Sequence, residues 1–173
     1  HGGYGARARI VRINGLDTAW GRADLAAVET MPCDGVLVPK VGAPADLDAV
    51  ALHVNQPLWA MIETPAAIVN AAAICAHPRL AGIVMGTNDL AKDLGARQGV
   101  ARGPLAYALG AALLAARAAG LVAIDGVYNA FTDEAGLAAE AEQGRDFGFD
   151  GKSVIHPAQL AVVNEAFSPR PDE

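Results

Sequence analysis

Short, β-branched apolar runs alternate along the chain with longer stretches rich in Ala and Leu. The short runs are apolar at nearly every position, which is typical of strands buried on both faces of a parallel sheet. The longer stretches have the length of helices, and a helical crossover is the usual connection between parallel strands. The alternation therefore predicts an α/β fold in which helices cover a parallel sheet.

The same pattern predicts where the elements lie. Strands are expected at residues 8–13, 35–39, 58–63, 81–86, 121–125 and 152–155. Helices are expected at about 19–30, 44–53, 65–76, 89–95, 103–119, 133–147 and 158–167. No linker or low-complexity tract divides the chain, so residues 1–173 are expected to form a single domain. About six strands are fewer than a complete (β/α)₈ barrel of roughly 250 residues contains, so either the sheet is open or part of a barrel is missing.

Composition excludes several classes of protein. With 53% hydrophobic and 18% charged residues, the chain can fill one core, and its Ala-rich stretch 109–119 is too short to span a membrane. The 13 Lys and Arg against 19 Asp and Glu leave no basic surplus for nucleic acid. The two cysteines, Cys33 and Cys75, lie in apolar stretches, and no export signal is visible. We therefore expect a cytoplasmic protein that binds neither nucleic acid nor membrane.

Polar residues stand where the predicted strands end. They are Arg12, Asn14, Lys40, Glu63, Thr64, Thr87, Asn88, Asp89, Asp125 and His156. Because the carboxyl ends of parallel strands meet at one edge of a sheet, we expect these side chains to converge. Two carboxylates, an arginine and a lysine would then form a polar site on apolar strands.

Glu63 and Asp89 are the most informative pair. Carboxylates at neighbouring strand ends, without His or Cys ligands, suit Mg²⁺, which usually takes one or two carboxylates and leaves positions for substrate oxygens. The alternative is that Glu63 forms an ion pair with Lys40 or Arg12 while Asp89 caps a helix that starts at Leu90. Spacing alone does not separate these two interpretations.

The other strand-end residues also allow two roles. Arg12 could present its planar fork to a carboxylate or an oxyanion, or form a buried ion pair. The turn at Gly86 and Thr87 could hold an anionic group. Asp125 could face the substrate or form a turn. His156 precedes Pro157 and is expected to be structural, bonded to neighbouring backbone.

Six segments match the motifs of one known family, in that family's order. They are VRING at 11–15, VLVPKV at 36–41, MIETPAAIVNAAAI at 61–74, GTNDLAKDLG at 86–95, AIDGVYN at 123–129 and GFDGKSVIHPAQLAVVNEAFSP at 148–169. Through these segments the chain resembles the citrate lyase beta-subunit-like branch of the HpcH/HpaI aldolase superfamily. The resemblance implies a (β/α)₈ TIM barrel, assembled into homo-oligomers, of which this chain covers about six βα units, the third to the eighth.

The resemblance also implies a function. It points to a Mg²⁺-dependent carbon–carbon lyase that cleaves a citryl, citramalyl or malyl thioester of CoA or an acyl carrier protein. The products would be an acetyl-type thioester and a 2-oxo acid. The family's metal carboxylates map to Glu63 and Asp89 and its substrate-binding arginine maps to Arg12.

Further substrate contacts are implied around the fourth predicted strand end. The backbone at Gly86 and Thr87 would hold the carboxylate of the 2-oxo acid, and Asn88 stands where the family more often has an acid. Retro-aldol cleavage also needs a base, and Asp125 is the candidate that this chain offers.

Two alternatives to the lyase remain open on the sequence. One is a class II aldolase of the same superfamily that acts on free pyruvate or oxaloacetate. The other is a non-catalytic relative that keeps the barrel only as a scaffold. Arg12, Glu63 and Asp89 argue against a scaffold, because a scaffold has no need for all three at one edge.

Overall fold

The computed structural model describes residues 4–97 and 100–169, and within them the strands form one six-stranded sheet in the order β1-β2-β3-β4-β5-β6. The strands are β1 (Ile10–Arg12), β2 (Gly35–Val38), β3 (Leu58–Ile62), β4 (Leu80–Met85), β5 (Val122–Asp125) and β6 (Gly151–Lys152). Every neighbouring pair is parallel. The predicted α/β class and parallel sheet are confirmed.

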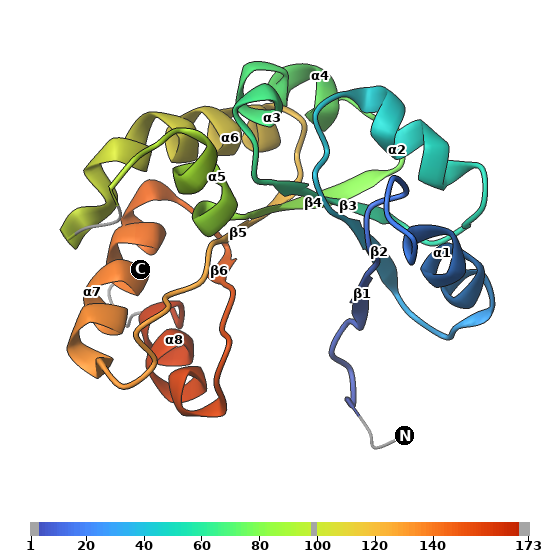
Figure 1. Ribbon diagram of the computed structural model, residues 1–173. Coiled ribbons are helices and arrows are strands. Elements are labelled where there is room, and N and C mark those ends of the chain that lie inside the picture. The colour runs from blue at the N-terminus through green and yellow to red at the C-terminus, as the bar shows by residue number, and fades with distance from the viewer. Residues whose placement is uncertain (1–3, 98–99, 170–173) are drawn as a thin grey trace.

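Helices connect the strands and lie mostly on the outer side of the curved sheet (Figure 1). They are α1 (Gly21–Thr30), α2 (Pro44–Ala51), α3 (Pro65–Val69), α4 (Ala71–Cys75), α5 (Thr87–Asp93), α6 (Ala106–Ala118), α7 (Glu134–Phe147) and α8 (Leu160–Ala166), with 3₁₀ turns η1 (Val100–Leu105) and η2 (Pro157–Gln159). The strands follow an arch rather than a closed ring (Figure 1). The described chain is a half-barrel, which confirms the prediction of a partial TIM barrel.

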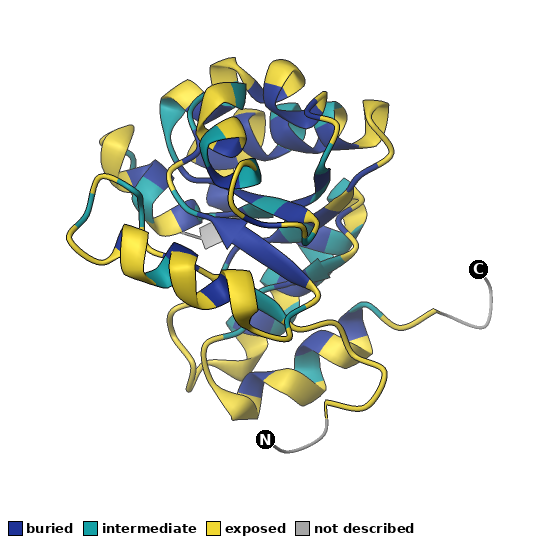
Figure 2. Cartoon of the chain, turned by 90° about the vertical axis from the view of Figure 1, so that its right-hand side faces the viewer, coloured by how far each residue is buried: buried dark blue, intermediate teal, exposed yellow. Residues whose placement is uncertain are grey.

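The core lies between the outer face of the sheet and the helices. Val36, Leu58 and Ile83 on the strands and Leu109 on α6 have no exposed surface. Figure 2 shows buried positions on the strands and on the inward faces of the helices, with exposed positions outside. Burial of one such aliphatic side chain stabilises a fold by about 1.5–3 kcal/mol, so this layer holds the arch together.

The concave face of the sheet is organised around one large aromatic residue. Trp59 lies across the strands over two glycines, and a Cβ added at Gly82 would stand 2.5 Å from its ring. Gly35 on β2 is covered in the same way, with the Trp59 ring 3.1 Å from its would-be Cβ. Glycine at these two positions lets the ring lie flat, which fills part of the barrel interior.

Several predicted elements differ in detail, among them a strand predicted at 8–13 that pairs only over Ile10–Arg12. The predicted helix at 65–76 is divided into α3 and α4 at Asn70, whose side-chain amide donates to the carbonyl oxygen of Gly42 at 2.7 Å. The predicted strand at 152–155 is shorter, because only Gly151 and Lys152 pair with β5. The helix predicted from residue 89 begins two residues earlier, at Thr87.

No helix in residues 4–97 or 100–169 is long and apolar enough to span a membrane. The Ala-rich stretch noted in the sequence lies in α6, which ends at Ala118.

The two cysteines are free, and their environments differ. Burial raises the pKa of the Cys75 thiol to about 11, whereas Cys33 is only half-buried. Because the thiolate is the reactive form, a small alkylating reagent at pH 8 is expected to modify Cys33 and to spare Cys75 in the native protein. Mass spectrometry of the native and the urea-unfolded protein checks this, and equal labelling of both cysteines in the native protein would contradict it.

Candidate functional site

Glu63 follows β3 directly and is almost completely buried, with 5% of its surface exposed. Its Oε1 accepts a hydrogen bond of 2.8 Å from the backbone N–H of Lys40. Burial raises the pKa of Glu63, and the Lys40 N–H opposes that rise by stabilising the charged form. The next residue, Thr64, caps α3 by accepting from the N–H of Ala67 at 3.1 Å, which fixes the course of the chain as it leaves β3.

Lys40 links the ends of three strands. It follows β2, and its positive φ of 55° turns the chain so that its backbone N–H reaches Glu63. Its Nζ donates to Oδ2 of Asp89 at 2.6 Å. This bond lowers the pKa of Asp89 and raises the pKa of Lys40. Lys40 therefore contacts both carboxylates, one through its backbone and one through its side chain.

Asp89 lies in the first turn of α5, where a negative charge is favoured by the helix dipole. The alternative that Asp89 caps a helix starting at Leu90 is wrong, because α5 starts at Thr87 and its N-cap is Gly86. The alternative of an ion pair between the side chains of Glu63 and Lys40 is also wrong. Lys40 donates to Glu63 through its backbone N–H, and its ammonium group binds Asp89 instead. Asp89 instead presents a half-exposed carboxylate next to the Lys40 ammonium.

Arg12 ends β1 and reaches the same region. Burial still leaves the pKa of Glu63 raised and the Lys40 bond is the main cause of the lowered pKa of Asp89, but the positive charge of Arg12 favours the ionised form of both carboxylates. Its side chain is exposed and forms no hydrogen bond or ion pair within residues 4–97 and 100–169. The structure thus brings Lys40, Glu63 and Asp89 together at the carboxyl edge of the sheet, and Arg12 ends β1 at the same edge without contacting them.

Gly86 brings β4 unusually close to Glu63. A Cβ at this position would overlap the Cβ of Glu63 and would stand 2.8 Å from its Oε2. The backbone N–H of Gly86 also donates to the carbonyl oxygen of Ile62 at 2.9 Å. The strand-to-helix turn at Gly86 therefore forms one wall against which the Glu63 side chain is held.

The donor set suits magnesium better than zinc. In the part of the chain that the structure describes, no three His, Cys, Asp or Glu side chains gather where they could hold a metal ion. Two carboxylates, those of buried Glu63 and half-exposed Asp89, are the kind of ligand set that Mg²⁺ uses. These two residues fit the predicted cofactor.

Asn88 and Thr87 face a second space beside the carboxylates. Asn88 forms two hydrogen bonds with Asn129, at 3.0 and 2.7 Å, one in each direction. Asn88 and Asn129 line a pocket of about 590 Å³. The rest of its lining is Thr87, Ala91, Arg97, Arg102, Pro104, Leu105, Val127, Tyr128, Ala130, Asp133, Gly136, Ala139, Glu140 and Gln143. The pocket is thus bounded by α5, η1, α7 and the loop that follows β5.

Asp125 has a different position from the one predicted for a base. It is completely buried, and its two oxygens accept from Arg102 at 2.7 and 2.9 Å, from Lys152 at 3.0 Å and from the N–H of Gly126 at 2.7 Å. A base needs a lone pair that faces the substrate. The geometry therefore assigns Asp125 to a buried ion cluster that ties η1 and α7 to the sheet.

The other members of this ion cluster were not singled out from the sequence. Lys152 donates to Glu140 at 2.7 Å, and Arg102 lies 3.7 Å from the same carboxylate. One signal was available. The buried side of α7 carries Leu137, Ala141 and Gly144, and Glu140 lies on the same side of the helix. A charged residue on the apolar side of a helix indicates a buried partner of opposite charge.

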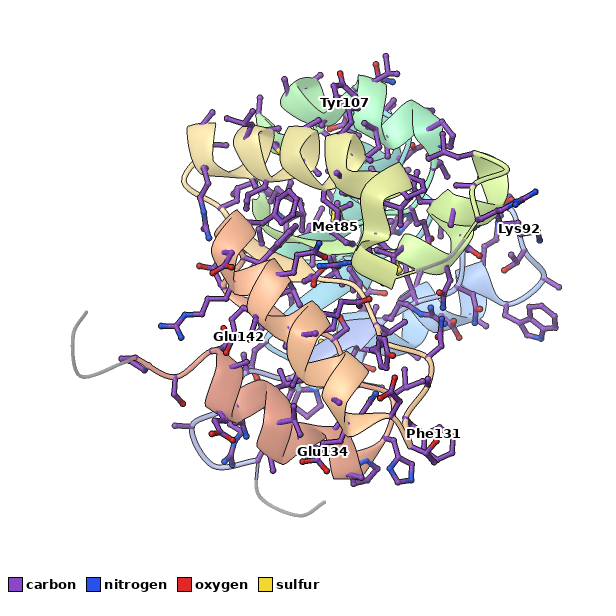
Figure 3. The ribbon with its side chains drawn as sticks, turned by 90° about the vertical axis from the view of Figure 1, so that its left-hand side faces the viewer. Met85, Lys92, Tyr107, Phe131, Glu134 and Glu142 are labelled. Carbon is purple, nitrogen blue, oxygen red and sulfur yellow. The ribbon has the colours of Figure 1, made fainter. Side chains whose placement is uncertain are left out.

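His156 has the structural role that the sequence predicts. Its Nδ1 accepts from the backbone N–H of Ala158 at 3.2 Å and caps the 3₁₀ turn that begins at Pro157. Its ring stacks on Phe131, with 4.8 Å between the ring centroids. Figure 3 shows Phe131 in the loop after β5, on the same side of the molecule as Glu134 at the start of α7.

The chain is similar to a group of thioesterases. It is 61% identical over 171 residues to a (3S)-malyl-CoA thioesterase of Cereibacter sphaeroides, a match that covers 98% of this chain and 60% of the relative. Three further proteins of the same name, from other strains, match at 60 to 61%. A thioesterase is a hydrolase, so these relatives contradict the predicted carbon–carbon lyase. The chain spans about 60% of the length of these curated relatives.

Solved structures share the fold and bind the predicted kind of ligand. The citrate lyase beta subunit of Mycobacterium tuberculosis, complexed with oxaloacetate and magnesium, is 32% identical, with a TM-score of 0.82 over 92% of this chain and 73% of that chain. A protein named CitE from the same organism, in complex with magnesium, acetoacetate and coenzyme A, is 33% identical, with a TM-score of 0.81 over 94% and 62%.

A family model supplies the remaining comparison. The model described as HpcH/HpaI aldolase/citrate lyase matches residues 3–157, which is most of the chain. The half-barrel, the paired strand-end carboxylates and the citrate lyase beta-like relatives agree with this match. The chain therefore belongs to the HpcH/HpaI aldolase/citrate lyase family.

Proposed function

We propose that this chain carries the magnesium-binding part of an enzyme that hydrolyses a malyl-CoA-type thioester. The observation that carries the proposal is that Lys40 bonds both Glu63 and Asp89 at the carboxyl edge of the sheet, where β1 also ends, at Arg12. The 61% identity to (3S)-malyl-CoA thioesterases favours hydrolysis and this acyl group. The magnesium and coenzyme A in related structures support the cofactor and the carrier.

Glu63 and Asp89 would hold the Mg²⁺ ion. When bound, the ion supplies a Lewis acid that polarises a substrate oxygen and lowers the pKa of coordinated water. Lys40 already holds Asp89 through its side chain and Glu63 through its backbone, so both carboxylates are oriented before the ion arrives. This preorganisation reduces the reorganisation needed on binding.

Arg12 would bind the free carboxylate of the acyl group. Its exposed guanidinium has no bonded partner in the described chain and lies close enough to both carboxylates to influence their pKa values. A planar fork matches a carboxylate with two parallel hydrogen bonds. Such an anchor would favour acyl groups that carry a second carboxylate over simple acetyl thioesters.

The remaining predicted contacts fit the same substrate. Gly86 leaves the space in which the Glu63 carboxylate stands, and Thr87 and Asn88 line the adjoining pocket. That pocket of about 590 Å³ combines apolar walls with amide side chains. A flexible arm with amide groups, like that of coenzyme A, has a complementary pattern.

The test is hydrolysis of (3S)-malyl-CoA by the purified protein, with and without Mg²⁺. Chromatography should detect free CoA and malate in equal amounts, and the rate should fall at least about 100-fold on removal of Mg²⁺ or in Glu63→Gln and Asp89→Asn. Each variant keeps the size of its side chain, so circular dichroism should show a folded protein. Asp146→Asn, which changes an exposed aspartate on α7, is the matched control and should keep the wild-type rate.

Two results would overturn this proposal. One is glyoxylate and acetyl-CoA as the products instead of malate and free CoA. The other is an unchanged affinity for Mg²⁺ in both carboxylate variants, measured by calorimetry, which would remove Glu63 and Asp89 from the metal site.

A further inference from the structure

We infer that Asn129 is a positioning residue for the carboxylate of Asp89 and that it acts through the side chain of Asn88. The inference rests on the proposed function, because it assigns Asn129 to the magnesium site. Asn129 belongs to the 126–133 loop, which connects β5 to α7. Asn88 and Asp89 are consecutive residues in the first turn of α5.

The contact between the two asparagines is specific. Nδ2 of Asn88 donates to Oδ1 of Asn129 at 3.0 Å, and Nδ2 of Asn129 donates to Oδ1 of Asn88 at 2.7 Å. Each carboxamide therefore uses one donor and one acceptor, a pattern that a carboxylate cannot complete because it lacks a donor. The pair fixes the orientation of Asn88 as well as its distance from the loop.

The loop that carries Asn129 is itself held at several points. Buried Lys152 donates to the carbonyl oxygen of Gly126 at 2.7 Å. The completely buried Gln159 donates to the carbonyl oxygen of Tyr128 at 2.9 Å. These bonds fix the residues on the amino-terminal side of Asn129. The carboxamide of Asn129 therefore contacts α5 from a part of the loop whose backbone is fixed by hydrogen bonds.

A second contact brings the same loop against α5. A Cβ added at Gly126 would stand 2.5 Å from Oγ1 of Thr87, so the loop backbone lies directly on the first residue of the helix. Helix α5 has only seven residues, Thr87–Asp93. Helices of this length are unstable alone and take their position from their neighbours. The 126–133 loop is one of those neighbours.

Asp89 is therefore fixed from two sides. On one side Lys40 holds its carboxylate at 2.6 Å, and on the other the Asn88–Asn129 pair holds the backbone turn from which it projects. Without the Asn88–Asn129 pair, Lys40 would still attract the carboxylate of Asp89. The direction in which that carboxylate points relative to Glu63 would then be less defined. A metal ligand needs that direction, whereas an exposed ion pair tolerates variation.

The experiment is a double-mutant cycle with Asn88→Ala, Asn129→Ala and the double variant. Hydrogen exchange of the peptide covering residues 86–93 should accelerate about threefold to thirtyfold in Asn129→Ala, as expected for the loss of two hydrogen bonds. The affinity for Mn²⁺, measured by electron paramagnetic resonance as a probe for Mg²⁺, should fall about threefold to tenfold. The double variant should lose no more affinity than the larger single loss, because both changes break the same link.

Asn164→Ala is the matched control, since Asn164 is an exposed asparagine on α8. It should leave both exchange in 86–93 and Mn²⁺ affinity unchanged. Unchanged Mn²⁺ affinity in Asn129→Ala, or losses that add in the double variant, would overturn the inference. A loss of affinity accompanied by global unfolding in circular dichroism would also overturn it, because the role would then be structural.

The two proposals fail in different ways. If the wild-type protein binds no Mn²⁺, the proposed function is overturned, and hydrogen exchange in 86–93 alone decides whether Asn129 positions α5. If the wild type binds Mn²⁺ and Asn129→Ala binds it equally well, the proposed function stands and the role of Asn129 is rejected.

Discussion

Replacement of Lys152 by methionine is expected to destabilise the fold by about 3–5 kcal/mol, because it leaves a buried negative charge without its partner. The Lys152 ammonium has no exposed surface and donates to Asp125, to Glu140 and to the carbonyl oxygen of Gly126. With Arg102 the cluster holds two positive and two negative charges, so it is neutral as it stands. A loss of this size is a large share of the roughly 5–15 kcal/mol that stabilises a typical domain.

Urea unfolding of three variants tests this expectation. Lys92→Met, a change of an exposed lysine on α5 (Figure 3), should alter stability by less than about 0.5 kcal/mol. Lys152→Met combined with Glu140→Gln removes one charge of each sign and should recover part of the loss. Equal stability of Lys152→Met and the wild type would show that the charges are solvated and that the cluster does not hold the helices to the sheet.

Gly86→Ala is expected to displace the Glu63 side chain and so to weaken Mg²⁺ binding by at least about tenfold. The added methyl group would overlap the Cβ of Glu63 and stand 2.8 Å from its Oε2 and 3.3 Å from Cγ of Met61. Overpacking of this kind also destabilises a fold by about 1–3 kcal/mol. Calorimetry of Mg²⁺ binding and urea unfolding measure the two effects separately.

Gly110→Ala is the matched control for that substitution. Gly110 lies in α6, and nothing stands within 4 Å of the position of the added Cβ. Alanine there should stabilise the helix by about 0.5–1 kcal/mol and leave Mg²⁺ affinity unchanged. Full Mg²⁺ affinity in Gly86→Ala would mean that the turn relaxes around the new methyl group and that the close approach does not determine the position of Glu63.

Hydrophobic pattern and strand-end polarity predicted much of the fold and of the site. β3 ends directly before Glu63 and β5 ends at Asp125, each within one residue of the predicted end, because each apolar run stops at a polar residue. The break at Asn70 was not predictable, because it depends on a hydrogen bond to Gly42, 28 residues away. The burial of Lys152 depends in the same way on distant partners, Asp125 at the end of β5 and Glu140 on α7.

The predicted reaction was wrong for a chemical reason. Arg12, Glu63 and Asp89 suit any reaction in which a metal ion polarises the oxygens of a hydroxyacyl thioester. Cleavage of a carbon–carbon bond and hydrolysis of the thioester differ in which bond breaks and in where water is admitted. Strand-end residues alone do not distinguish these outcomes, and the thioesterase relatives overturned the lyase prediction.

The arch of strands has two lateral edges within the described residues. Within the described residues, β1 pairs only with β2, and β6 only with β5, so each has one edge with no strand beside it. An unpaired edge is a template for another strand, from the same chain or from a second molecule. The two edge strands differ in length, because β1 has three residues and β6 has two. A further strand that pairs with this sheet would therefore find more backbone donors and acceptors along β1 than along β6.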